Sequence, residues 1–152
     1  MRAVIQRAKN AAVAVDNKTV GAIKSGLLVL LCVMEGDNEA CAEVMAKKTA
    51  NLRIFNDSEG KMNLSPLDLG LDMLVVSQFT LCADCKKGSR PSFSSSAEPI
   101  RAEGLYKYYI ERLKAEGAKR VESGVFAAHM DVSLVNDGPV TIIFDSDVWI
   151  KP

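Results

Sequence analysis

A short polar run at the end of an apolar stretch is the first candidate for chemistry. Ser77, Gln78 and Thr80 follow the apolar residues 73–76. A strand that ends in such a run can expose backbone N–H groups, which bind an anion or the oxyanion of an acyl-transfer reaction. The same side chains could instead cap the strand end through local hydrogen bonds. Both interpretations stay open from these residues alone.

The single histidine bears on whether Ser77 or Thr80 could be a nucleophile. A hydroxyl without a paired base is a poor nucleophile at neutral pH. His129 is the only histidine in the sequence that could act as that base. No G-x-S-x-G elbow accompanies it. We therefore interpret His129 as an ordinary residue at the start of a strand. A Ser/Thr hydrolase of another ester, using Ser77 or Thr80 with His129, is the less favoured alternative.

Two cysteines, Cys82 and Cys85, have the spacing of redox and zinc motifs. A structural zinc site needs two more ligands, and Cys32, Cys41 and His129 form no second pair with that spacing. A thioredoxin-like motif begins a helix, whereas this one runs into a polar loop. We expect neither a metal nor a cofactor.

A basic loop follows the cysteines. Lys86, Lys87 and Arg90 stand close together beside Phe93. Most such clusters are solvated surface, but this one could contact an RNA backbone. The chain has 19 basic and 19 acidic residues, so its zero net charge argues against non-specific binding to nucleic acid. We expect no DNA partner.

The composition is that of a globular protein. Apolar residues make up 48% and charged residues 25% of 152 residues, which predicts one domain spanning residues 1–152. No apolar run approaches the roughly 20 residues of a membrane helix. The N-terminus lacks the apolar core of a secretory signal, so we expect a cytoplasmic protein with reduced thiols and no membrane partner.

The pattern of apolar residues predicts a mixed, largely antiparallel α/β domain with two main helices. The first helix is predicted from an N-cap at Asp37 to Leu52, and the second from Pro99 to Gly117. One stripe of the second helix should face the core: Ala102, Leu105, Tyr106, Tyr109 and Leu113. Residues 53–65 predict a short hairpin. The predicted strands are residues 3–8, 11–15, 19–23, 27–34, 73–81, 120–126, 130–135 and 140–145, with a turn at residues 16–18.

The stretch around Asp137 and Gly138 carries contradictory signals. Asp-Gly between apolar runs is a strong hairpin signal. Pro139 follows immediately, and proline has no N–H group to donate to a strand ladder. The sequence does not explain why a tight turn would lead directly into proline.

Two motifs together resemble the signatures of the D-aminoacyl-tRNA deacylases, also called D-tyrosyl-tRNA deacylases. They are SQFTL at residues 77–81 and NDGPVT at residues 136–141. The stretches MRAVIQR, GLLVLL, LRIFND with GKMN, and KGSRPSF fall in the family's order, so the resemblance covers the whole chain. Cys32 and Ala127 stand where the family has glycine. Ala127 should demand a negative φ more strictly than glycine would.

The resemblance implies a homodimer that hydrolyses the ester between a D-amino acid and the terminal adenosine of tRNA, without a cofactor. The active site would lie at the dimer interface, where a cis Gly138–Pro139 pair from the partner forms a chiral gate. The catalytic pocket would comprise Ser77, Gln78, Phe79 and Thr80. The gate and its supports would comprise Gly138, Pro139, Arg7, Asn136, Val140 and Thr141. Phe126 and Met130 would contact the adenosine, and the basic loop of Lys86, Lys87 and Arg90 the RNA backbone.

Chirality and mechanism follow as hypotheses. A rigid wall of carbonyls would reject an L side chain by clash, accept many D side chains and let glycine through. Water attack assisted by the substrate's own 2′-hydroxyl, with N–H groups near Phe79 and Thr80 binding the oxyanion, is the favoured mechanism. Covalent attack by Thr80 is the second. An RNA-binding module without catalysis is the non-enzyme alternative.

Overall fold

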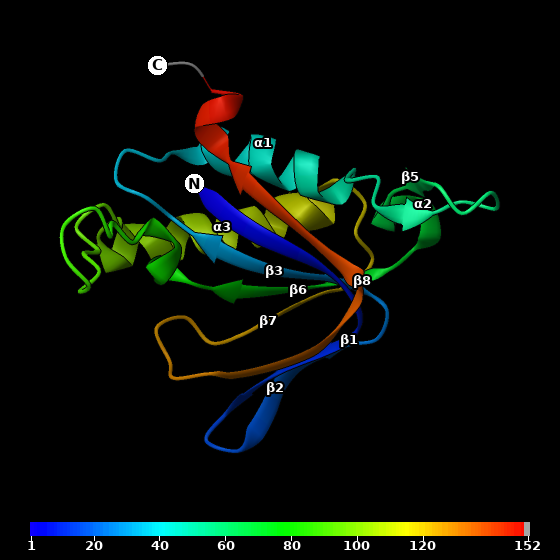
Figure 1. Cartoon of the computed structure of the whole chain (residues 1–152), viewed down its shortest axis with the longest axis horizontal. Coiled ribbons are helices and arrows are strands. Elements are labelled where there is room, and N and C mark those ends of the chain that lie inside the picture. The colour runs from blue at the N-terminus through cyan, green and yellow to red at the C-terminus, as the bar shows by residue number, and fades with distance from the viewer. Residues whose placement is uncertain (151–152) are drawn as a thin grey trace.

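A six-stranded mixed sheet forms the centre of the computed structural model, which describes residues 1–150 (Figure 1). The strand order is β2-β1-β3-β6-β7, and β8 pairs with the other edge of β1. β1 is antiparallel to β2, β3 and β8, whereas β3–β6 and β6–β7 are parallel pairs. The strands are β1 (Arg2–Val15), β2 (Lys18–Ile23), β3 (Gly26–Cys32), β6 (Asp72–Ser77), β7 (Val121–Ser123) and β8 (Asp131–Asp145).

The first strand is one long element, where two were predicted. Its first half, from Arg2 to Ala8, pairs with β3, and its second half pairs with β2. Lys9 and Asn10 looked like an interruption, but they are exposed residues within a continuous strand. The prediction failed because two exposed residues do not end a strand when the segments before and after them are both paired.

Two predicted turns are confirmed. Asp16 and Asn17 join β1 to β2 with φ angles of 50° and 63°, the positive values that a two-residue hairpin requires. β4 (Phe55–Asn56) and β5 (Met62–Leu64) form the short hairpin predicted within residues 53–65.

Two long helices, α1 (Glu39–Ala50) and α3 (Pro99–Ala115), pack together on one face of the sheet (Figure 1). Both were predicted, and α2 (Pro66–Leu69) is a further single turn. The N-cap of α1 is Asn38, whose side chain accepts from the Cys41 N–H, so the prediction of Asp37 is wrong.

The carboxylate of Asp37 serves a different purpose. It accepts from the Met1 ammonium at 2.6 Å and from the Met34 N–H at 2.6 Å. The same ammonium donates to the Ser146 hydroxyl beyond the end of β8. These buried contacts tie the start of β1 to the end of β8 and to the loop before α1.

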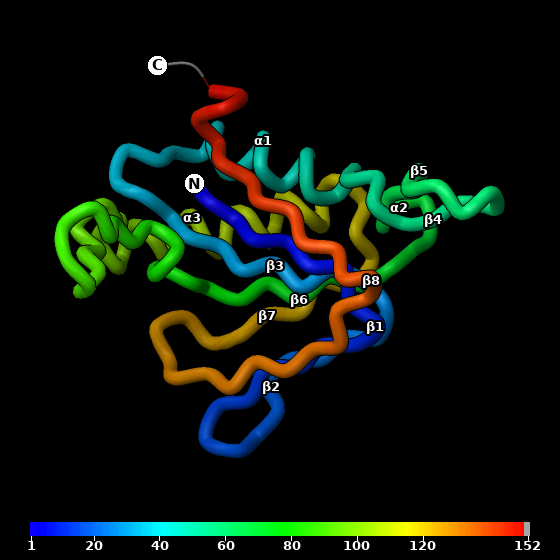
Figure 2. The backbone as a smooth tube through the Cα atoms, in the orientation of Figure 1, coloured from blue at the N-terminus to red at the C-terminus, as the bar shows by residue number. Residues whose placement is uncertain are grey.

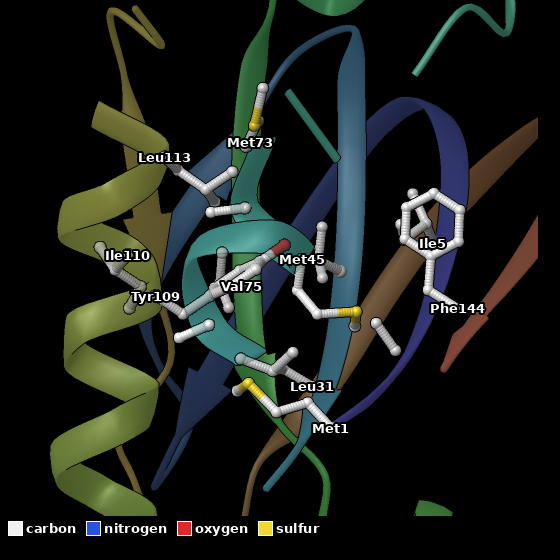
Figure 3. Close-up of a cluster of buried hydrophobic side chains, with 14 of the residues drawn as sticks. Met1, Ile5, Leu31, Met45, Met73, Val75, Tyr109, Ile110, Leu113 and Phe144 are labelled. Atoms are coloured by element: carbon white, nitrogen blue, oxygen red, sulfur yellow. The ribbon is translucent and has the colours of Figure 1, made fainter. Parts of the chain in front are cut away.

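The main core lies between the helices and the sheet. Figure 3 shows Tyr109 and Leu113 of α3 pointing toward Met73 and Val75 of β6, and Ile110 of α3 belongs to the same buried cluster. These side chains are buried, and each contributes about 1.5–3 kcal/mol when fully buried. The predicted core stripe of the second helix is confirmed: Ala102, Leu105, Tyr106, Tyr109 and Leu113 are all buried.

The predicted hairpin at Asp137-Gly138 does not form. β8 continues through it and bends there, as the tube in Figure 2 shows. Thr141 pairs with Gln6 and Asn136 with Ala8, so residues 137–140 bulge opposite Arg7. Pro139 therefore lies where the ladder is already interrupted, which answers the contradiction in the sequence. The Gly138–Pro139 peptide is cis, as the family resemblance implied.

The predicted fold class, a mixed α/β domain with two main helices, is confirmed. Residues 151 and 152 of the predicted domain lie outside the described residues. Within residues 1–150, no helix has the length and apolar character needed to cross a membrane.

Candidate active site

The polar run after β6 forms a tight turn. The predicted strand to Leu81 ends at Ser77, and a 3-10 helix, η1 (Phe79–Cys82), follows. The Gln78 N–H donates to the Leu31 carbonyl at 2.8 Å, and the Leu81 N–H donates to the Gln78 carbonyl at 3.2 Å. The first N–H groups of a helix have no acceptor within it. Among residues 1–150, the N–H groups of Phe79 and Thr80 have no acceptor, so they are available to a ligand.

A cleft of about 590 Å³ adjoins this turn. Ser77, Gln78 and Phe79 form one side, and the loop from Phe126 to Met130 forms another. In Figure 2 this loop and the segment after β6 lie at the same end of the sheet. The structure therefore brings two separately predicted groups, the SQF residues and the adenosine-binding pair, into one cleft.

Aromatic rings make up much of the cleft wall. Phe126 lies against Tyr106 with 5.7 Å between ring centroids, and Phe79 meets Phe93 edge to face at 5.2 Å. The Tyr106 hydroxyl donates to the Val75 carbonyl at 2.8 Å, and burial raises the pKa of Tyr106 to about 12. Such a slot suits a flat ring. Our sequence reasoning assigned Tyr106 only to the core and gave Phe93 no role, although Phe93 lies within the KGSRPSF motif.

The backbone of Ala127 differs from the expectation of a negative φ. Its φ is +62°, so it occupies the left-handed region that alanine was expected to avoid. That conformation costs an alanine about 1–2 kcal/mol. The neighbouring Gly124 has a related constraint, because a Cβ there would lie 2.5 Å from the Met130 sulfur. Met130 therefore packs closely against the backbone at Gly124, and Ala127, between Phe126 and Met130 in the sequence, lines the cleft.

No base lies beside the hydroxyl groups of the turn. Thr80 Oγ1 accepts from the Gln78 side-chain amide. The His129 side chain is on the cleft rim but 96% exposed, and its nearest carboxylate is that of Asp131, at 3.9 Å. Among residues 1–150, His129 makes no hydrogen bond to Ser77 or Thr80, so no nucleophile–base pair is assembled.

Cys32 supports the turn from inside the protein. Its buried thiol donates to the Phe79 carbonyl at 3.5 Å. Burial, together with the neighbouring Cys82 thiol, raises the pKa of Cys32 to about 12, so the thiol keeps its proton. All four cysteines are free, with Cys82 buried and Cys85 exposed. Within residues 1–150, no group of three or more metal-ligating side chains is present.

The residues predicted for the chiral gate form a second cluster around the cis peptide. The buried Arg7 guanidinium donates to the Asp137 carbonyl at 2.8 Å and to the Ile54 carbonyl at 2.7 Å. A Cβ on Gly138 would lie 2.7 Å from Val140 Cγ2 and 3.2 Å from Arg7 Nη2. Arg7 thus holds the bulge closed from behind.

The side chain of Asn136 closes the same bulge from the strand. Its Oδ1 accepts from the Val140 N–H at 2.8 Å, and its Nδ2 donates to Thr141 Oγ1 at 3.2 Å. Gly138 and Pro139 themselves are exposed. The gate cluster therefore comprises Arg7, Asn136, Gly138, Pro139, Val140 and Thr141.

Within one chain, the gate cluster and the cleft are separate. Neither Gly138 nor Pro139 lines the cleft. In Figure 2 the bend of β8 lies away from the end of the sheet that carries the loop of residues 124–130. The two halves of the predicted site do not meet in a single subunit.

The predicted RNA-contacting loop is exposed and follows η1 directly. Lys86, Lys87 and Arg90 are all exposed. Reciprocal backbone hydrogen bonds of 2.8 and 2.9 Å between Asp84 and Ser92 close the base of this loop. Phe93, just after this loop, lines the cleft, whereas Lys86, Lys87 and Arg90 are not among the residues that line it.

Comparison with known proteins identifies the relatives of this chain. The family profile described as D-Tyr-tRNA(Tyr) deacylase matches residues 4–145. A D-aminoacyl-tRNA deacylase of Thermosipho africanus is 58% identical over 146 residues, 96% of this chain and 97% of that protein. Another, from Dehalococcoides mccartyi strain CBDB1, is 54% identical over 152 residues, 100% of this chain and 99% of that protein.

Solved structures share the fold. The c-Myc DNA Unwinding Element Binding Protein superposes with a TM-score of 0.90 at 39% identity, covering 95% of this chain and 98% of that one. A probable eukaryotic D-amino acid tRNA deacylase superposes with a TM-score of 0.80 at 18% identity, covering 94% and 97%, which shows the fold alone. Because the profile and these close relatives span nearly the whole sequence, the chain belongs to the D-aminoacyl-tRNA deacylase family.

Proposed function

We propose that this protein hydrolyses the ester between a D-amino acid and the terminal adenosine of tRNA, and that it does so as a homodimer. The observation that carries the proposal is the pair of N–H groups, of Phe79 and Thr80, that have no acceptor among residues 1–150; Phe79 lines the aromatic cleft and Thr80 directly follows it. Two such donors can bind the oxyanion that forms when water attacks an ester carbonyl. The adenine of the substrate stacks in the slot between Phe126 and Met130.

The attacking water is activated by the substrate. No protein base is paired with Thr80 or Ser77 among residues 1–150, and the single histidine is solvent-exposed. The ribose 2′-hydroxyl next to the ester is the remaining group that can orient the water, accept its proton and pass its own proton to the departing ribose oxygen. The protein contributes binding of the adenosine, placement of the carbonyl and stabilisation of the oxyanion.

Discrimination between enantiomers requires a second subunit. Gly138 and Pro139 are exposed and remote from their own cleft, yet Arg7 and Asn136 hold them rigidly. β8 is an edge strand, and its exposed apolar residues include Val135 at 49% and Ile143 at 76%. Such an edge favours association with another chain. In the dimer, each gate enters the partner's cleft and its carbonyls exclude an L side chain.

The test is deacylation of D-tyrosyl-tRNA compared with L-tyrosyl-tRNA by the purified protein. The expected result is turnover of the D substrate and negligible turnover of the L substrate. Comparable hydrolysis of both would contradict the chiral gate. Binding of tRNA without hydrolysis of either would favour the alternative of an RNA-binding module.

Mixing two variant subunits tests whether the gate acts across the interface. A cleft variant, Phe126→Ala with Met130→Ala, is combined with a gate variant, Gly138→Val. A heterodimer then carries one composite site without either change, so mixing is expected to restore D-specific activity to about half per heterodimer. If the gate served its own subunit's cleft, no heterodimer would contain an intact site and mixing would restore nothing. The cytoplasmic location, the absence of a DNA partner and the RNA contacts of Lys86, Lys87 and Arg90 stay predictions.

A further inference from the structure

A second hollow, of about 580 Å³, lies between the end of α1 and the end of the chain. We call it the Trp149 pocket and define it by Lys47, Lys48, Arg53, Phe144 and Trp149, which line it together with Asn51, Leu52 and Glu116. Trp149 follows a short 3-10 turn, η2 (Ser146–Val148), that lies near α1 in Figure 1. The matched family profile ends at residue 145, so Trp149 is outside the region that the profile describes.

The charge of the pocket is positive. Three of its residues are cationic and one, Glu116, is anionic. Glu116 is itself 3.9 Å from the Arg112 guanidinium. Among residues 1–150, neither Lys47 nor Lys48 has a carboxylate within ion-pair distance. The pocket therefore presents cations to an anionic ligand.

The pocket also presents an aromatic face. The Trp149 ring meets Phe144 nearly at right angles, with 5.0 Å between centroids, which fixes the plane of the indole. The Lys48 ammonium lies 5.5 Å from the centroid of that ring. Cations beside a fixed aromatic face match a nucleotide, because the base stacks on the ring while the phosphate pairs with the lysines.

The pocket lies close to the gate cluster. Arg7 donates to the carbonyls of both Asp137 and Ile54, and Ile54 directly follows Arg53 of the pocket. Along β8, Phe144 is five residues from Pro139, so at most about 17 Å of extended strand separates them. A few nucleotides of single-stranded RNA cover that distance.

We infer that the Trp149 pocket binds a nucleotide of the single-stranded 3′ end of the tRNA, upstream of the terminal adenosine. The inference rests on the proposed function, since the terminal adenosine must be held beside a gate. The inference adds a stacking site and a phosphate site to the proposed function. These two sites increase the affinity for tRNA without contacting the ester. The pocket residues affect binding of the long substrate and not the chemical step.

Intrinsic fluorescence tests the inference directly, because Trp149 is the only tryptophan in the chain. The unmodified protein is titrated with uncharged tRNA, cytidine monophosphate and inorganic phosphate. Uncharged tRNA and cytidine monophosphate are expected to quench the fluorescence by stacking, and inorganic phosphate is not. Equal quenching by inorganic phosphate would overturn the nucleotide assignment in favour of a simple anion site.

The variant Lys47→Ala/Lys48→Ala is compared with Lys107→Ala/Lys114→Ala, which removes two exposed lysines of α3 that pair with Glu103 and Glu111. The pocket variant is expected to weaken tRNA binding about tenfold or more. It should also reduce the slope of log affinity against log salt by about 0.7 for each lysine that contacts a phosphate. The α3 variant should bind as the unmodified protein does. Equal affinities for the two variants would overturn the inference.

A truncated substrate separates this inference from the proposed function. With D-tyrosyl-adenosine, the pocket variant should turn over at the unmodified rate, whereas with D-tyrosyl-tRNA its KM should rise about tenfold at unchanged kcat. If neither substrate is hydrolysed by the unmodified protein, the proposed function fails, and the fluorescence titration still decides the pocket. If both substrates are hydrolysed and the variant's KM for tRNA is unchanged, the pocket inference fails alone.

Discussion

The hydroxyl of Thr80 distinguishes the two hydrolytic mechanisms, and Thr80→Val is the change that removes it. Valine keeps the shape of the side chain and leaves the backbone N–H in place. In the structure, Thr80 Oγ1 accepts one hydrogen bond, from the Gln78 side-chain amide, at an exposed position. Such a bond contributes about 0.5–1.5 kcal/mol. If all of it acted in the transition state, kcat/KM would fall about tenfold or less.

Covalent catalysis predicts a far larger effect. Removal of the nucleophile of a hydrolase lowers kcat by about 10⁶-fold, equivalent to about 8 kcal/mol. Because His129 is 96% exposed and makes no hydrogen bond to Thr80 among residues 1–150, we expect the small effect. The two mechanisms differ by about five orders of magnitude in the predicted rate.

The assay is single-turnover deacylation of D-tyrosyl-tRNA with excess enzyme, followed by mass spectrometry of acid-quenched protein. Thr80→Ser is the matched control, since it retains the hydroxyl. A loss of more than about 10³-fold in Thr80→Val that Thr80→Ser restores would refute substrate-assisted catalysis, since a single oxyanion donor accounts for about 10²–10³-fold. A tyrosyl adduct on Thr80 would refute it as well.

Three further predictions concern the gate cluster and the strand ends. Arg7→Ala removes charged hydrogen bonds to the Asp137 and Ile54 carbonyls. The free energy of unfolding in urea should fall by about 3–5 kcal/mol, and hydrolysis of L-tyrosyl-tRNA should increase. An unchanged unfolding midpoint would count against this role of Arg7. Gly138→Ala places a Cβ 2.7 Å from Val140 Cγ2, and residue 138 has a φ of +140°. Thermal unfolding of this variant should therefore show a destabilisation of about 1–3 kcal/mol. Full D-specific activity in the variant would contradict the close fit at Gly138. Burial is the largest single influence on Asp145 and favours its neutral form. The hydrogen bonds from Arg2 and from the Asp147 N–H, with the charges of Arg2 and of the N-terminus, together outweigh burial and lower the pKa of Asp145. The stability from these contacts is therefore present above the unfolded pKa of 3.8 and is lost as pH falls through the lower folded value. Asp145→Asn should cost up to about 1 kcal/mol at pH 7 and progressively less as pH falls below 3.8, and a pH-independent difference would refute the assignment.

Local sequence patterns predicted most of the elements that carry the site. The apolar run before Ser77, the proline at the start of α3 and the turn at Asp16 and Asn17 depend on neighbours a few residues away. Their physical causes are strand burial, helix N-terminal geometry and positive φ, all of which act over short stretches of chain. The two family motifs likewise predicted, by residue number, the two segments that form the halves of the proposed site.

Contacts between distant residues decided the points on which the sequence was wrong or silent. Asp37 does not cap α1, because its carboxylate accepts instead from the Met1 ammonium, 36 residues away. Ala127 adopts a positive φ in a loop that lines the cleft. No local pattern encodes the Met1 contact of Asp37.

The gate shows the same division most clearly. The sequence alone determined that Gly138 and Pro139 are adjacent, that proline cannot donate to a ladder and that Asp-Gly favours a turn. Only the tertiary structure decided that β8 continues through them. β8 pairs with β1 on both sides of the bulge, and Arg7 donates to the Asp137 carbonyl 130 residues away. Both contacts exist only in the folded chain. The same long-range packing joins Trp149 to the end of α1 and makes a pocket from residues a hundred positions apart.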